Sequence, residues 1–402
     1  MMRMVKISDV CEFQSGLWKG KKGPFTKANV IRNTNFRPNG NLSYENIAFL
    51  EVETKELYKR QLQHGDIILE KSGGGEKTPV GRVCLFEKQN DKTSFSLSNF
   101  TCFIRVKDPS ILDYKFLHKF LYFMYEAGKT EPMQKNSTGI RNLQLKEYKD
   151  ISIALPQISE QQRIVAKLNI AFTEIDKLSK IYSKKLKLIN ELSDCVLDNK
   201  LGNNSLKLNE ACDLIKRGIS PKYLKTQGVA VINQRCIRNH KIDYSKARRH
   251  NMNLKKVPEE RFIRNGDVLI NSTGQGTLGR VAQVKQDPFE KTTVDSHVTI
   301  VRPKKELFNL GFFGNSLIKI EKKLEAAAEG ASGQTELSRS KLENEFFIPY
   351  VDSINEQKKI SILLDSMFEN TFNLKDLTVK LMENLKVLRL SFLQKEFNKK
   401  TK

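Results

Sequence analysis

The chain has 402 residues, which is too long for one hydrophobic core, because single cores stop growing at about 250–300 residues. Hydrophobic residues are 39% of the chain and charged residues 29%, and this balance excludes a membrane protein. Lys and Arg outnumber Asp and Glu by 69 to 46. The net charge of +23 favours a polyanionic partner, nucleic acid first, over a lysine-rich surface kept for solubility.

The cysteines and the N-terminus predict where the protein works. The six Cys form no CxxC pair, and the five His do not cluster with them. A disulfide framework or a metal site is therefore not expected. The N-terminus lacks the apolar segment of a signal peptide. We expect a cytoplasmic protein without a bound metal.

The two halves of the chain repeat each other in the same order. The matched segments are VIR (30–32) and VIN (231–233), HGDIIL (64–69) and NGDVLI (265–270), GRV (81–83) and GRV (279–281), NSTGIRNLQL (136–145) and GASGQTELSR (330–339), and LPQISEQQRIVAKL (155–168) and IPYVDSINEQKKISILL (348–364). Since the offset drifts only between 193 and 201, the pattern indicates an internal duplication.

Each copy begins with a part of about 150 residues that mixes strands and helices. The apolar, β-branched runs GDIIL and GDVLI predict strands after a Gly-Asp turn, and GRVCLF and GRVAQV predict the strands that return. Residues 114–127 and 310–329 are predicted to be helical.

Each copy ends in a long helix with apolar residues at alternating spacings of four and three. Such a seam suits a partner helix, and the simplest partner is the other copy; the alternative is that each helix packs only on its own domain. The predicted seam residues are Ile164, Leu168, Ile175, Leu178, Ile189 and Leu192 in the first helix, and Ile360, Leu364, Leu374, Leu381, Leu385 and Leu388 in the second. A helix of this length spans roughly 60 Å, which suits two DNA readers held at a fixed spacing.

Three pairs of polar segments lie at matching positions of the two copies. They combine Gly, which lets a backbone approach DNA closely, with side chains that bind phosphates or base edges. The candidate DNA-binding residues are Arg32, Asn33, Asn35, Lys71, Ser72, Lys77, Arg82, Arg141 and Asn142 in the first copy, and Asn233, Gln234, Arg235, Ser272, Thr273, Gln275, Arg280 and Gln334 in the second. The alternative for each residue is a solvated side chain or a turn hydrogen bond.

Two glycine-rich segments imitate nucleotide-binding motifs. Residues 274–279 fit GxGxxG, but the following residues alternate like a strand, whereas a dinucleotide site requires a helix there. Residues 73–78 lack the Gly that a P-loop needs before its Lys. Since no set of titratable residues recurs in both copies, we predict no catalytic residues.

The segments GDIILEKSGGG…GRV and NSTGIRNLQLKEYKDISIALPQISEQQRIVAKLN resemble the specificity subunit of type I restriction–modification systems. The resemblance implies an α+β fold in which two mixed α/β target-recognition domains, at 1–154 and 201–347, are joined by two long antiparallel coiled-coil spacer helices, at 155–200 and 348–402. The repeat then relates the two halves by a pseudo-two-fold axis. The second copy departs from the pattern, because IPYVDSINEQKKIS is less regular than the first.

The resemblance also implies the function. Such a subunit is not an enzyme: it reads an asymmetric bipartite target in double-stranded DNA, one half per domain. It docks two modification (methyltransferase) subunits and, optionally, two ATP-driven restriction subunits, for adenine methylation or cleavage. S-adenosylmethionine and ATP belong to these partners, so the chain itself is expected to bind no cofactor. The alternatives are a specificity subunit of a related defence or modification complex, and an autonomous DNA nuclease or methyltransferase.

Overall fold

The computed structural model describes residues 3–17, 20, 22–75, 78–88, 94–137, 139–202, 204–327 and 336–398. The chain divides into two compact units, one of Met1–Tyr182 with Lys380–Lys402 and one of Ser183–Val379. Each unit combines an α/β domain with parts of two long helices, α5 (Ile158–Lys200) and α10 (Ile354–Phe397). Among the described residues, no helix is both long enough and apolar enough to cross a bilayer.

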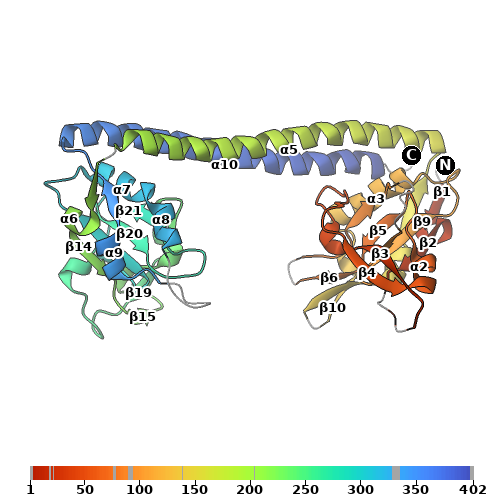
Figure 1. Ribbon diagram of the computed structural model, residues 1–402, viewed down its shortest axis with the longest axis horizontal. Helices are drawn as coiled ribbons and strands as arrows, with labels where there is room; N and C mark the ends of the chain where they lie inside the picture. The colour runs from red at the N-terminus through yellow and green to blue at the C-terminus, as the bar shows by residue number, and fades with distance from the viewer. Residues whose placement is uncertain are drawn as a thin grey trace. The chain divides into compact units, whose positions relative to one another are not determined.

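The first unit is built on two sheets (Figure 1). One is an antiparallel sheet in the order β2 (Cys11–Ser15), β9 (Thr101–Val106), β5 (Ile67–Glu70) and β7 (Val83–Leu85). The other has the order β4 (Ala48–Glu53), β3 (Phe25–Ile31) and β8 (Phe95–Leu97), with β3 and β8 parallel. The smaller strands are β1 (Arg3–Lys6) paired with β12 (Ser152–Leu155), and β10 (Gln134–Ser137), β11 (Ile140–Leu143) and β6 (Ser72–Gly74).

Short helices complete the first unit. They are α1 (Ile7–Val10), η1 (Asn33–Asn35), α2 (Thr54–Arg60), α3 (Tyr114–Glu126), η2 (Glu131–Met133) and α4 (Leu145–Lys149). The apolar face of α3 packs on the sheet and on the end of α10, where the ring of Phe397 lies 5.4, 5.6 and 5.8 Å from those of Phe116, Phe120 and Phe123. The first core therefore contains residues from both ends of the chain.

The second unit repeats this topology. Its antiparallel sheet has the order β14 (Cys212–Arg217), β23 (Val298–Pro303), β20 (Val268–Asn271) and β21 (Val281–Gln283). Its second sheet has the order β15 (Tyr223–Leu224), β19 (Arg248–His250), β16 (Val229–Ile232) and β22 (Thr292–Val294). Two further pairs are β17 (Ile237–Arg238) with β18 (Lys241–Ile242), and β13 (Ser205–Lys207) with β24 (Phe347–Pro349).

The helices of the second unit are short as well. They are α6 (Leu208–Ala211), η3 (Gln234–Cys236), η4 (Tyr244–Lys246), η5 (Glu259–Arg261), α7 (Leu310–Lys319), α8 (Glu321–Ala326) and α9 (Arg339–Glu345). The predicted single helix at 310–329 is thus interrupted at Ile320, which ends α7 and precedes α8. The strands predicted for GDIIL and GDVLI are confirmed as β5 and β20, and β21 confirms that a strand follows the GxGxxG segment.

The Gly-Asp turns have a structural role. Asp66 accepts hydrogen bonds from Nε and Nη2 of Arg105, both at 2.7 Å, and Asp267 accepts the same pair from Arg302 at 2.7 Å. Because Asp66 and Asp267 are buried, these bidentate ion pairs fix the start of β5 and β20 against the neighbouring strand. The repeated Asp residues are therefore explained by folding.

The two long helices pair antiparallel in the first unit and share a hydrophobic core in the second. In the first unit, Lys167 Nζ lies 2.5 Å from Glu396 Oε1, and Asp176 pairs with Arg389. Residue numbers therefore rise along α5 where they fall along α10, as in an antiparallel pair. In the second unit, Leu197 of α5 shares one core cluster with Leu364 of α10. Both helices thus belong to the hydrophobic core of the domain in each unit.

The register of the predicted seam is partly wrong. Leu178, Leu192, Leu374 and Leu388 are 39%, 53%, 37% and 43% exposed, although Ile164, Leu168, Ile175, Ile189, Leu364 and Leu385 are buried and Ile360 and Leu381 are half-buried. The inward position next to Leu192 is Ser193, whose hydroxyl donates to Ile189 O at 2.9 Å. Thr378 is likewise buried and donates to Leu374 O. Such hydroxyls bond to the backbone of their own helix, so small polar residues can occupy inner positions while these four leucines are exposed.

Candidate nucleic-acid interface

In the first unit the three predicted polar segments meet at the loop that follows β5. Strand β6 pairs with β11, which places Ser72 opposite Asn142 and Gly74 opposite Arg141. Ser72 Oγ lies 2.5 Å from Asn142 Oδ1. Asn33 reaches the same loop, because a Cβ on Gly73 would lie 2.7 Å from Asn33 Nδ2. Gly73 has a φ of +106°, so this close approach requires glycine.

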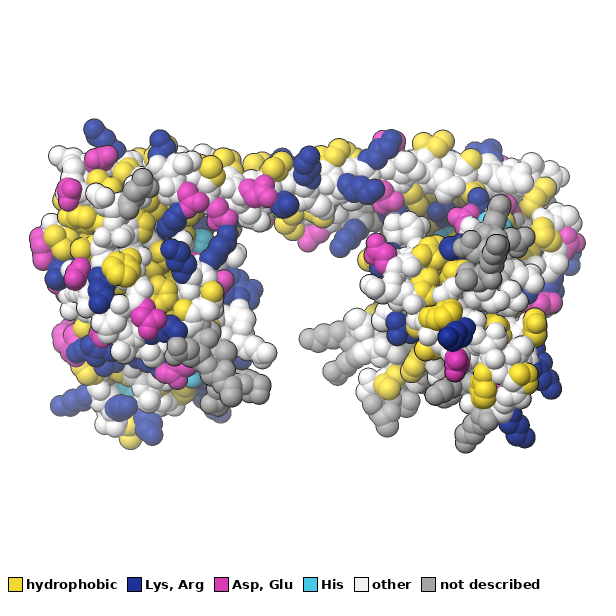
Figure 2. Space-filling model, in the orientation of Figure 1, with side chains coloured by type: hydrophobic (Ala, Val, Ile, Leu, Met, Phe, Trp, Pro, Cys, Tyr) yellow, Lys and Arg dark blue, Asp and Glu magenta, His cyan; other side chains and the backbone are white. Residues whose placement is uncertain are grey.

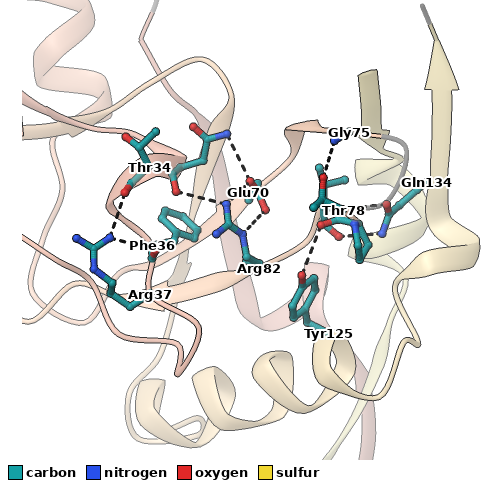
Figure 3. Close-up of polar contacts among 12 residues, drawn as sticks. Thr34, Phe36, Arg37, Glu70, Gly75, Thr78, Arg82, Tyr125 and Gln134 are labelled. Atoms are coloured by element: carbon teal, nitrogen blue, oxygen red, sulfur yellow. Dashed lines mark hydrogen bonds and ion pairs between the residues drawn. The ribbon is translucent and has the colours of Figure 1, made fainter. Parts of the chain in front are cut away.

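Arg82 is engaged inside this cluster (Figure 3). Its Nε and Nη2 donate to the two oxygens of Glu70 at 2.7 Å, and Nη2 also donates to Asn33 O at 3.3 Å. Glu70 is 2% exposed, and its hydrogen bonds raise the pKa of Arg82. The guanidinium lies 5.5 Å from the centre of the Phe36 ring. Most of its charge is therefore committed to holding the loop, which favours the structural alternative for Arg82.

The other candidates of the first unit differ in exposure. Asn35 is 2% exposed and closes the η1 turn by accepting from Arg32 N at 3.0 Å, so its side chain serves the turn. The side chain of Arg32 is exposed, and Lys71 Nζ donates to Ser15 Oγ at 3.1 Å. Lys77 lies outside the described residues.

In the second unit, two of the corresponding segments, at 233–235 and 272–280, also meet. Asn271 Nδ2 donates to Gln234 O at 3.2 Å and to Thr277 O at 3.0 Å. A Cβ on Gly274 would lie 2.4 Å from Gln234 Oε1, and Thr273 forms a β-bridge with Glu336. The loop after β20 is thus the meeting point, as the loop after β5 is in the first unit. The candidate Gln334 lies outside the described residues.

Several candidates of the second unit are interior residues. Ser272 is fully buried and lies 2.5 Å from Thr299 Oγ1, and Asn233 is 8% exposed and caps η3 by accepting from Arg235 N. By contrast, the side chains of Arg235 and Gln275 are exposed. Exposed polar side chains around a closely packed glycine turn are the part of this loop that can reach a ligand.

The two matched arginines differ in their partners. Asn271 stands where the first unit has Glu70, and Arg280 Nη2 donates to Gly276 O at 2.8 Å. Among the described residues, no carboxylate forms an ion pair with Arg280. Its positive charge is therefore available to an anion, whereas that of Arg82 is balanced by Glu70.

A second basic surface was not predicted from the sequence. Figure 2 shows Lys and Arg side chains gathered over the part of the second unit that carries β15 and β19. In it, the guanidinium of Arg248 stacks 3.3 Å from the centre of the Tyr223 ring, and Arg249 pairs with Glu290 at 2.6 Å. The signal was the ARRH run at 247–250, which has no basic counterpart in the first copy.

Three buried thiols of the first unit are held in the protonated form. Burial raises the pKa of Cys11, Cys84 and Cys102 to about 12, so these thiols stay protonated at neutral pH. Among the described residues, no group of three or more His, Cys, Asp or Glu is placed to hold a metal ion.

Comparison with known proteins gives the context of this site. The family model described as the type I restriction modification DNA specificity domain matches residues 2–188 and again residues 204–381. The specificity subunit of the type I restriction enzyme EcoKI from Escherichia coli K12 is 24% identical over 194 residues, which are 46% of this chain and 40% of that protein. The aligned region thus spans about two fifths of that relative.

Solved structures share the fold. A chain of a type I R-M system, solved to explain its complex assembly and conformational transition, has a TM-score of 0.75 and 18% identity, with 98% of this chain and 97% of that chain covered. The HsdS subunit from Thermoanaerobacter tengcongensis has a TM-score of 0.55 and 19% identity, with 99% and 96% covered. These likenesses confirm the predicted α+β fold of two related domains. Since the family model covers most of the residues in two successive copies, the chain belongs to the family of type I restriction modification DNA specificity domains.

Proposed function

We propose that this chain is the DNA-sequence specificity subunit of a type I restriction–modification complex and that each unit reads one half of a bipartite target. The observation that carries the proposal is that polar segments far apart in the sequence meet at one glycine-rich loop at the end of a central strand, three of them in the first unit and two in the described part of the second. The net charge of +23 supports a polyanionic ligand.

The two loops are built alike but differ in their side chains. The first presents Ser72, Asn142 and Arg141 around a neutralised Arg82, and the second presents Thr273, Gln275 and an Arg280 without a carboxylate partner among the described residues. Because base edges are distinguished by the pattern of donors and acceptors, the two loops prefer different bases. The target is therefore asymmetric.

The helices supply a docking surface for the methyltransferase subunits. Four of the leucines expected in the seam, Leu178, Leu192, Leu374 and Leu388, are exposed instead. So are Ile170, Ile181 and Leu188 of α5, at 69%, 58% and 52%. On α10, Ile362 and Val387 are 63% and 68% exposed. Apolar residues that recur along a helix face fit a partner helix, and family membership favours a methyltransferase subunit as that partner.

The chemistry belongs to the partners. We propose that the chain itself is not catalytic, that the methyl donor binds the methyltransferase subunits, and that ATP binds restriction subunits when these join. The cytoplasm, where the DNA lies, is the proposed location.

The test is expression of the chain with its methyltransferase subunits in a host without adenine methylation, followed by sequencing of methylated adenines. We expect one split motif, present only when all subunits are expressed. Purified chain alone, incubated with Mg²⁺, ATP and S-adenosylmethionine, should leave DNA intact and unmethylated. Turnover by the chain alone that survives repurification would instead show an autonomous enzyme.

A further inference from the structure

Each unit carries one exposed ring at an equivalent turn. Phe100 lies between β8 and β9, and His297 lies between β22 and β23, 197 positions later. Phe100 is 43% exposed, and the side chain of His297 is exposed as well. Neither residue belongs to the polar segments that the repeat pattern singled out.

The backbone ties both rings to the loops described above. Phe100 O accepts from Lys71 N at 2.9 Å and from Ser72 N at 3.2 Å, and His297 O accepts from Ser272 N at 2.8 Å. The turns themselves are braced, because Thr101 Oγ1 donates to Ser98 O at 2.8 Å and His297 N donates to Asp295 Oδ1 at 3.0 Å. The main chain that carries each ring is therefore held at a fixed place beside the loop where the polar segments meet.

The rings differ in what they offer a ligand. Phe100 is close to Gly73, on which a Cβ would lie 3.8 Å from Phe100 Cδ1, and it presents only apolar atoms. His297 Nδ1 lies 2.7 Å from Thr273 Oγ1. Among the described residues, His297 Nε2 has no hydrogen-bond partner. If the Thr273 hydroxyl donates to Nδ1, Nε2 carries the proton and is a donor.

We infer that Phe100 and His297 are base-reading side chains, one in each unit, and that their difference helps to make the target asymmetric. This inference rests on the proposed function. An apolar ring on a groove edge favours the methyl group of thymine, whereas an N–H donor favours O6 or N7 of guanine. Phe100 therefore selects thymine in one half of the target, and His297 selects guanine in the other.

The test is a reciprocal exchange, Phe100→His and His297→Phe, in the complete complex with its methyltransferase subunits. Methylation is measured on duplexes in which each position of the wild-type target is randomised in turn. We expect Phe100→His to lower the preference for thymine at one position of one half by about tenfold, and His297→Phe to lower the preference for guanine in the other half similarly. The untouched half should keep its wild-type sequence in each variant.

Two controls separate base reading from surface chemistry and folding. Phe49→His changes an exposed phenylalanine (59%) of β4 in the first unit, and Phe289→His changes one in the β21–β22 connection of the second. Both should keep the wild-type motif. If an exchange lowers the melting temperature, Phe100→Ser and His297→Ala repeat the measurement with smaller side chains that lack the apolar ring or the N–H donor, and the same loss of preference is expected.

The outcomes distinguish this inference from the proposed function. If the wild-type complex methylates a defined split motif and the exchanged variants methylate the same motif with unchanged preferences, the assignment of Phe100 and His297 is wrong and the proposed function stands. If the wild-type complex recognises no defined sequence, the proposed function itself fails.

Discussion

Gln161 and Gln357, 196 positions apart, make the same three hydrogen bonds in the two units. Gln161 Oε1 accepts from Asp113 N, and its Nε2 donates to Ile111 O and Pro156 O, all at 2.9 Å. Gln357 does the same with Asn309 N, Leu307 O and Val351 O at 2.7, 2.9 and 2.6 Å. Each glutamine is fully buried and joins the first turn of a long helix to the start of α3 or α7.

Gln161→Leu should destabilise the first unit, and Gln357→Leu the second. Each change leaves three partly buried backbone groups without these partners, at up to about 1–3 kcal/mol for each group. Denaturant unfolding monitored by hydrogen exchange should show that Gln161→Leu lowers the stability of the first unit and that Gln357→Leu lowers that of the second. Gln162→Leu, at an exposed neighbouring position, is the matched control and should unfold like wild type. Equal stability of Gln161→Leu and the control would contradict this role.

The arginines Arg82 and Arg280 should give different phenotypes although the repeat matches them. Arg82→Ala leaves Glu70 buried and unpaired, so we expect a loss of about 3–5 kcal/mol of stability. The double variant Glu70→Gln with Arg82→Ala should recover much of it. Thermal and denaturant melting of the wild type, Arg82→Ala and the double variant measure these stabilities. An unchanged melting curve for Arg82→Ala would refute the structural role of Arg82.

Arg280→Ala should melt like wild type, because no described carboxylate depends on its charge. In the assembled complex it should weaken DNA binding and reduce the slope of log affinity against log salt by about 0.9 for one lost phosphate contact. Titrations at several salt concentrations measure this slope. If Arg280→Ala binds DNA with wild-type affinity at every salt concentration, Arg280 does not contact DNA.

Leu178→Asp and Ile175→Asp should separate the outer and inner faces of α5. Leu178 is 39% exposed and Ile175 is 4% exposed. We expect Ile175→Asp to lower the melting temperature strongly, because a carboxylate enters an apolar core. Leu178→Asp should melt nearly like wild type but bind the methyltransferase subunit more weakly in co-purification. Strong destabilisation by Leu178→Asp would show instead that Leu178 packs in the interior seam between the helices.

His118 should make the first unit sensitive to acid. This α3 residue is 5% exposed, and burial lowers its pKa from 6.5 to about 3. Since the unfolded state binds the proton more tightly, the stabilisation is present above pH 6.5 and is lost as the pH falls toward 3, by up to about 1.4 kcal/mol per pH unit. The difference in unfolding free energy between pH 7 and pH 5 should shrink in His118→Leu. His64→Leu, at an exposed position, should keep the wild-type difference.

The sequence was sufficient for the architecture but not for the roles of single side chains. The repeat offset identified segments that occupy equivalent positions in the two domains, because duplicated sequence motifs keep their positions in a duplicated fold. The register of the helices failed at Leu178 and Leu192, because hydrophobicity alone does not tell which face of a helix packs against the second helix, and because Ser193 is polar yet buried.

The candidate site shows the same limit. Asn35, Asn233 and Ser272 have the side chains of base readers but are buried in turns, which only the packing around them reveals. Phe100 and His297 share no residue type, so the repeated residue types did not single them out. Their equivalence comes from the turns that carry them.

The closing of the first core by Leu393 and Phe397 has a consequence for biosynthesis. On the ribosome, the N-terminal half emerges about 200 residues before the segment that covers Phe116, Phe120 and Phe123. The domain translated first is therefore completed last. A premature stop codon near the 3′ end of the reading frame would expose the aromatic face of α3, and so would impair the domain most distant from it in the gene.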